Sequence, residues 1–264
     1  MTPRRLRGLA WIAIACGALV IAGLAVAYVF LPAQLVVAVL RTHLDPLVLR
    51  DVHGSAWHGE ALRAGWDELA LGHARWDADK LAALRGVLRA ELRCDMPKDQ
   101  HLALHVEARG NAVALSGLRA TLVGGALEGF FRRRHLVPIG SVALRIDAAR
   151  FEDGIPVALR GDALWRQATL VGADSPLPYY LGDLRIVFRI AERGVVSGSI
   201  ADEGGPVHVA GTLRADPIGY RLVLRLAARD PRLAAGLGRL GEAQPDGSRL
   251  LVLQDGWWWK RRHA

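Results

Sequence analysis

An uninterrupted apolar run from Leu9 to Leu31 constrains this chain more than any other feature, because it decides where the rest of the chain folds. Arg4, Arg5 and Arg7 precede the run, and Pro32 follows it. A helix of this length rises about 1.5 Å per residue and covers the roughly 30 Å hydrocarbon core of a bilayer. The run therefore predicts a single N-terminal transmembrane helix over residues 9–31.

The orientation of this helix follows from its flanking charges. The arginines lie on the N-terminal side only, so the positive-inside rule predicts a cytoplasmic tip of residues 1–8 and sends residues 33–264 across the membrane. A cleaved signal peptide is the alternative, because Ala25-Val26-Ala27 resembles a cleavage site. Signal-peptide apolar regions usually span about 7–15 residues, and this run is longer, which favours a retained signal-anchor.

Composition limits what lies beyond the apolar run. Cys94 is the only cysteine there, so no intramolecular disulfide can form. The net charge of +8 comes almost entirely from arginine, and the arginines are spread among strand-like segments instead of clustering with aromatic residues. This distribution is typical of the solvated face of a sheet, and it disfavours nucleic acid as a partner.

Alternation with a period of two predicts a mainly β fold. Apolar residues alternate with arginine or small residues over 218–226, 184–190 and 142–146, which is typical of half-buried strands. Further strands are expected at Leu102–Ala108, Ala112–Leu118, Ile155–Leu159, Val195–Ile200, Val207–Leu213 and Leu250–Leu253. The connections are too short for repeated helical crossovers, so we expect a curved antiparallel sheet. One short late helix is expected at Arg232–Leu240, with Asp230 as its cap.

A weak internal repeat suggests structural turns. The segment Gly54–Ala61 is echoed by Gly161–Ala168, and each contains a tryptophan. The two copies indicate either a duplicated β-unit, about 43–172 and 179–256 within the β-rich domain 33–264, or two independent glycine turns that each precede a buried tryptophan. The residues expected to shape these turns are Gly54, Trp57, Gly59, Gly161 and Trp165.

The search for chemistry yields no site. Gly236–Gly241 has the spacing of a dinucleotide-binding glycine motif, but it falls in the expected late helix instead of between a strand and a helix start. The histidines lack metal-ligand spacing, and Ser197 lacks the preceding glycine that a nucleophile elbow needs. We therefore expect no catalytic, cofactor-binding or metal-binding residue.

Two segments have the chemistry of contact surfaces. Arg132, Arg133 and Arg134 follow two phenylalanines, and Trp257, Trp258 and Trp259 precede further positive charge near the end of the sequence. Aromatic residues beside cations are typical of membrane interfaces and protein hot spots. The alternative for the second segment is a terminus whose tryptophans fold back onto the sheet.

The order of these features resembles protein N of the bacterial type II (general) secretion pathway. The motifs that carry the resemblance follow the basic tip and the predicted span: Gly54-Ser55-Ala56-Trp57-x-Gly59, Trp76, Gly161-x-x-x-Trp165, Asp202-Glu203-Gly204-Gly205-Pro206, and Asp230-Pro231 leading to Leu240-Gly241. The resemblance implies a single-pass inner-membrane protein with a β-rich periplasmic domain, without catalytic residues, that assists export of folded proteins through an outer-membrane secretin. It implies the secretin and its inner-membrane connector as partners. The tryptophan tail lies outside the family pattern.

The strand pattern also permits functions of other classes. An apolar sheet face can meet either a packed core or an acyl chain, so an anchored, lipid-handling β-groove is the main alternative. An anchored hydrolase would need an exposed pair of nucleophile and base. The sequence leaves the oligomeric state open.

Overall fold

The computed structural model describes residues 28–37, 47–66, 69–97, 100–131, 135–172, 178–230 and 236–256. Most of the predicted transmembrane segment 9–31 lies outside these ranges, as does the tip 1–8. Within the described ranges no helix combines the length and the apolar character that a membrane crossing requires.

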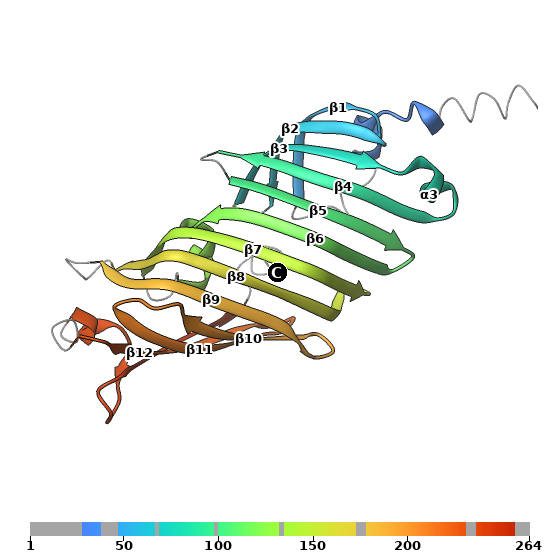
Figure 1. Ribbon diagram of the computed structural model, residues 1–264. Coiled ribbons are helices and arrows are strands. Elements are labelled where there is room, and N and C mark those ends of the chain that lie inside the picture. Colours follow the sequence, from blue (N-terminus) through green and yellow to red (C-terminus); the bar gives the residue numbers. More distant parts are fainter. Residues whose placement is uncertain are drawn as a thin grey trace, which may run out of the picture.

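The described residues form one antiparallel sheet of fourteen strands (Figure 1). Strand order follows the sequence except at the end, where β14 lies between β12 and β13. The strands are β1 (Leu47–Gly54), β2 (His58–Trp66), β3 (Leu69–Ala78), β4 (Val87–Met96), β5 (Gln100–Arg109), β6 (Ala112–Val123), β7 (Leu136–Glu152), β8 (Ile155–Gly172), β9 (Tyr179–Glu192), β10 (Val195–Asp202), β11 (Val207–Ala215), β12 (Gly219–Ala228), β13 (Glu242–Ala243) and β14 (Arg249–Gly256).

The helical elements are short. Besides the helical residues 28–29 and 33–37 at the start of the described chain, they include α3 (Lys80–Leu84), the 3₁₀ turn η1 (Gly124–Leu127), α4 (Glu128–Phe131) and the 3₁₀ turn η3 (Gly236–Arg239). The late helix expected at 232–240 is therefore seen only as η3 within the described residues, and residues 231–235 lie outside them. Gly236 and Gly238 fall inside this turn, and glycine is a poor former of regular α-helix.

The prediction of a mainly β, antiparallel fold is confirmed, and every expected strand coincides with an observed one, although β12 begins at Gly219, one residue after the expected start at 218. The strands β1 to β4 and the helix α3 were not predicted. β8 pairs directly with β9, so the strands on either side of residues 173–177 belong to the same sheet. The division into two β-units stays a prediction.

The sheet is twisted, and its C-terminal strands curl back toward the middle ones (Figure 1). One apolar cavity is lined by side chains of both β7 and β12, which are far apart in strand order. The largest core cluster lies in this concave region, and its most deeply buried members include Leu170, Leu181, Leu184, Leu226 and Leu251.

The connection from β6 to β7 covers this concave face. Residues 124–131 form η1 and α4, and Phe131 is only 3% exposed. The Phe131 ring lies 6.0 Å from that of Trp165, and the Phe130 ring meets Tyr220 edge-on at 4.8 Å. The Tyr220 hydroxyl donates a hydrogen bond of 3.0 Å to the Phe130 carbonyl, which fixes this cover to β12.

Candidate functional site: the Trp57 junction and the concave face

Trp57, in the turn between β1 and β2, joins the start of the described chain to the sheet. Its indole Nε1 donates to the Tyr28 carbonyl at 2.7 Å, and the two rings lie 4.7 Å apart. The Ala56 N–H donates to the Leu31 carbonyl at 2.7 Å. Residues 28–31, the last of the predicted apolar run, therefore pack against the first hairpin.

Glycine is required on both sides of Trp57. Gly54 has a φ of +85°, and a Cβ there would approach the His58 carbonyl oxygen to 2.6 Å. A Cβ on Gly59 would lie 2.4 Å from the Trp76 ring. Trp76 also donates its indole N–H to the Ala56 carbonyl at 3.2 Å, so β3 holds the turn as well.

Further contacts fix the same segment. The Tyr28 hydroxyl donates to the Lys80 carbonyl at 2.8 Å, and the Gln34 side-chain amide donates to the Val52 carbonyl at 2.9 Å. Ala33 is 1% exposed and packs into a small cluster with Val52. We name the contacts of residues 28–37 with the first hairpin and Lys80 the Trp57 junction. Its geometry fixes the direction in which the chain leaves the sheet.

Gly161 and Trp165 lie inside β8 instead of at a turn, so the sequence-based expectation of a turn there is wrong. A Cβ on Gly161 would meet the Phe188 ring at 2.6 Å, which explains glycine as a close-packing residue. Trp165 is 3% exposed and donates its indole N–H to the Ile139 carbonyl at 2.9 Å. This second glycine–tryptophan pair builds the C-terminal core.

The cavity in the concave face has a volume of about 290 Å³. Its lining is entirely apolar and combines the cover residues Leu127 and Phe130 with sheet residues such as Ile186, Phe188 and Leu222. Sequence reasoning missed this arrangement, although the Phe130-Phe131 pair was the signal that could have indicated a buried cover. The geometry suits a ligand without polar groups.

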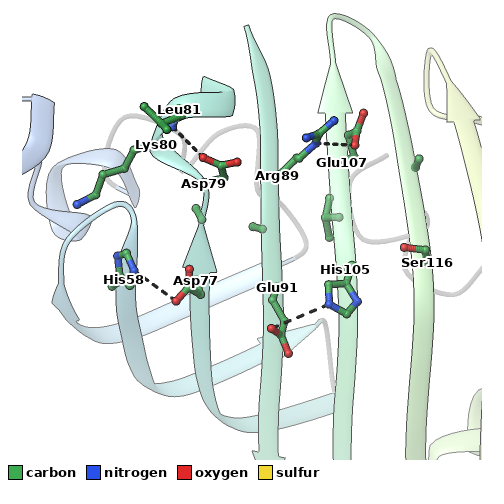
Figure 2. Close-up of a pocket in the computed structure, with 14 residues that line it drawn as sticks. His58, Asp77, Asp79, Lys80, Leu81, Arg89, Glu91, His105, Glu107 and Ser116 are labelled. Atoms are coloured by element: carbon green, nitrogen blue, oxygen red, sulfur yellow. Dashed lines mark hydrogen bonds and ion pairs between the residues drawn. The ribbon is translucent and has the colours of Figure 1, made fainter. Parts of the chain in front are cut away.

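The opposite face of the first strands is polar. Figure 2 shows a shallow hollow crossed by one row of paired residues, His58, Asp77, Glu91, His105 and Ser116, from β2 to β6. His58 Nε2 lies 3.3 Å from an Asp77 carboxylate oxygen. Beside this row, Arg89 Nε donates to Glu107 at 2.8 Å. Exposed opposite charges that neutralise each other are typical of a solvated sheet face.

Two titratable groups have strongly shifted pKa values, and both have structural explanations. Burial and the charge of Asp95 raise the pKa of the Cys94 thiol to about 11, so it stays protonated and unreactive. Desolvation opposes ionisation of Asp202, but hydrogen bonds from the Val209 and Gly204 N–H groups and from Arg229 outweigh it and lower its pKa to about 2. Asp202 therefore holds the β10–β11 turn as a carboxylate.

The remaining predicted sites have these outcomes. Within the described ranges no three His, Cys, Asp or Glu side chains are grouped to hold a metal ion. Arg132, Arg133 and Arg134 lie outside the described residues, as do Trp257, Trp258 and Trp259, so these contact surfaces stay predictions.

A comparison with protein families gives one match. The model of the family described as type II secretion system (T2SS), protein N, matches residues 45–252, which include every described strand except the last residues of β14. Neither the comparison with curated proteins nor that with solved structures gives a significant match.

Proposed function

The chain belongs to the type II secretion system protein N family, and we propose that it acts there as an accessory, non-enzymatic scaffold subunit anchored in the inner membrane. The family match over residues 45–252 is the observation that carries this proposal. In the proposed topology, residues 1–8 are cytoplasmic, a single helix spans the membrane and the β-rich domain lies in the periplasm.

The Trp57 junction supports an orienting role for the anchor. Residues 28–31 pack on the first hairpin, so residues 9–27 remain for the bilayer, and a helix of that length covers about 28 Å. This is close to the thickness of the hydrocarbon core. A short, fixed connection between helix and sheet holds the domain at one angle to the membrane, which is useful for a scaffold that receives other anchored subunits.

The partners in this proposal are the secretin and its inner-membrane connector. Confinement to one membrane raises the effective concentration of anchored subunits near one another, so even a weak docking surface suffices. We propose Arg132, Arg133 and Arg134 together with Trp257, Trp258 and Trp259 as that surface, because cation–aromatic composition is typical of interface hot spots.

The test is in-membrane cross-linking of the tagged full chain in cells that carry the secretion machinery. A photoreactive amino acid replaces Arg133 in one variant and Trp258 in a second, and Arg89, exposed on the polar face, serves as the control position. We expect cross-links to the secretin or its connector from the first two positions and none from the control. Absence of any secretion subunit from both positions would contradict the scaffold role.

Secretion itself provides the functional readout. Cells that lack the chain should retain a folded cargo in the periplasm, and the wild-type chain should restore its export. A Trp57→Ala variant keeps the family domain but loses the indole contacts to Tyr28, so we expect export to fall while the amount of membrane-bound chain is unchanged. Full export by this variant would remove the orienting role of the junction.

A further inference from the structure

The cavity under the β6–β7 cover offers no polar group to a ligand. Every residue that lines it is apolar, and the indole N–H of Trp165 already donates to Ile139. A peptide backbone placed there would leave its N–H and C=O groups without partners, and burying such groups is costly. An alkyl chain carries no such groups.

The size of the cavity exceeds that of an ordinary packing defect. Protein cores contain few voids larger than a water molecule. An apolar cavity of roughly 150 Å³ stays dry and accepts benzene, so about 290 Å³ has room for roughly ten carbon atoms. The space suits a substantial part of one acyl chain.

An apolar path connects this cavity to the Trp57 junction. Leu122 and Leu144 pack against both the main core cluster and the cluster of Leu104 on β5. Leu92 then links the Leu104 cluster to the cluster of Cys94. Leu49 in turn packs against both the Cys94 cluster and the cluster of Ala33 and Val52 beside the junction. Packed apolar side chains thus form a continuous chain of contacts from the junction to the cavity.

We propose that the cavity and this apolar path bind an acyl chain of a membrane phospholipid. The bilayer as its source rests on the proposed membrane anchoring, because the junction end of the path lies where the predicted helix meets the sheet. The cover residues Leu127 and Phe130 close over the chain end, and β9 and β12 form the walls. The ligand class follows from the lining alone.

The experiment uses the full chain reconstituted in phosphatidylethanolamine–phosphatidylglycerol vesicles. These contain a phospholipid with a photoreactive diazirine at the middle of one acyl chain, and labelled peptides are mapped by mass spectrometry after irradiation. We expect labels in residues 124–131 and in β9 and β12. A second phospholipid with the diazirine in its headgroup should label residues 124–131 at least fivefold less.

Neighbouring residues of β9 provide a matched pair of variants. Ile186 lines the cavity, whereas Val187 is 48% exposed on the opposite face. Ile186→Trp fills the cavity and should lower acyl-chain labelling of residues 124–131 at least fivefold. Val187→Trp should leave it within twofold of the wild type. Circular dichroism and thermal unfolding check that both variants are folded.

Two results would overturn the inference. Labels confined to residues 9–31 in the wild type would show that the acyl chains stay in the bilayer, and this result does not depend on any variant folding. Equal labelling of folded Ile186→Trp and wild type would place the lipid elsewhere. Cross-links to secretion subunits are measured separately, so the lipid site can fail while the scaffold role stands.

Discussion

The six strands β1 to β6 and the eight strands β7 to β14 belong to one antiparallel sheet but bury their apolar faces to different depths. Leu184 and Leu226 in the second region are 1% and 0% exposed. In the first region Leu92 and Leu102 are only partly buried, and alanines make up much of the core. The second region curls and carries the 124–131 cover. The depth to which an apolar side chain is buried therefore depends on the curvature of the sheet and on the 124–131 cover, and not on the alternation alone.

Truncation of one leucine in each region tests this difference most strongly. Leu184→Ala removes a fully buried side chain from the covered region and should lower the free energy of unfolding by about 3 kcal/mol. Leu92→Ala should lower it by about 1 kcal/mol, because the side chain already contacts water. Urea denaturation of both variants gives the two values.

Equal losses for the two variants would break the comparison, since they would mean that both regions are packed to the same depth. Leu88→Ala, at a leucine that is 47% exposed on β4, serves as the control and should change stability by less than about 0.5 kcal/mol.

The carboxylate of Asp202 should give the next largest effect. Its side chain is 4% exposed and accepts from Arg229 and from the N–H groups of Val209 and Gly204. Asp202→Asn should cost about 2 kcal/mol at pH 7, because the charge-assisted bonds are lost. The same substitution at Asp162, a partly exposed residue 3.9 Å from Arg185, should have little effect.

The pH dependence of this effect follows from the pKa of Asp202, which is about 2 in the folded chain against an ordinary value of 3.8. A lowered pKa stabilises the fold above the unfolded-state value, and the contribution is lost as pH falls from about 4 toward 2. The difference in unfolding free energy between wild type and Asp202→Asn should therefore shrink over that window. A difference independent of pH would assign the loss to packing instead of charge.

The same contrast explains which elements could be predicted from sequence. Strands with large apolar residues at every second position, such as β9 and β12, show the period plainly. The buried positions described in β2 and β3 are mostly alanines, so the pattern is faint: Ala61, Ala64, Leu71, Ala74 and Ala78. Asp51 adds a positive φ of 52°, and the pair that it would form with Leu62 is missing from the β1–β2 ladder. Small buried residues and this irregularity concealed the first four strands.

The two parts of the candidate site were predictable to different degrees. The glycines around Trp57 indicate a turn because their spacing is local, whereas the contact of Tyr28 with Trp57 is long-range and has no sequence signal. The Phe130-Phe131 pair was a local signal for a buried cover, but its position against β12 could not be inferred, because the bond from Tyr220 to Phe130 joins residues 90 positions apart. Long-range packing on a curved sheet leaves no periodic signal in the sequence.

The Trp57 junction provides a smaller, more local test. Trp57→Phe retains an aromatic ring beside Tyr28 but removes the indole N–H, so we expect a loss of about 1 kcal/mol. Hydrogen exchange should accelerate at Ala56, whose N–H donates to Leu31, and stay unchanged in β9. Acceleration throughout the sheet would mean that the junction supports the whole fold instead of one segment.

A substitution on the polar face of β4 and β5 should change the free energy of unfolding least, and it provides the baseline for the comparison of the two regions. Arg89 and Glu107 pair at 2.8 Å, but their side chains are 58% and 49% exposed, so water and salt screen the attraction. Arg89→Gln should therefore cost about 0.3 kcal/mol, and 1 M salt should abolish the difference. A loss above about 1 kcal/mol that persists in salt would mean that β1 to β6 depend on their charged face for stability. The stability of these strands would then need no acyl chain on their shallow apolar face.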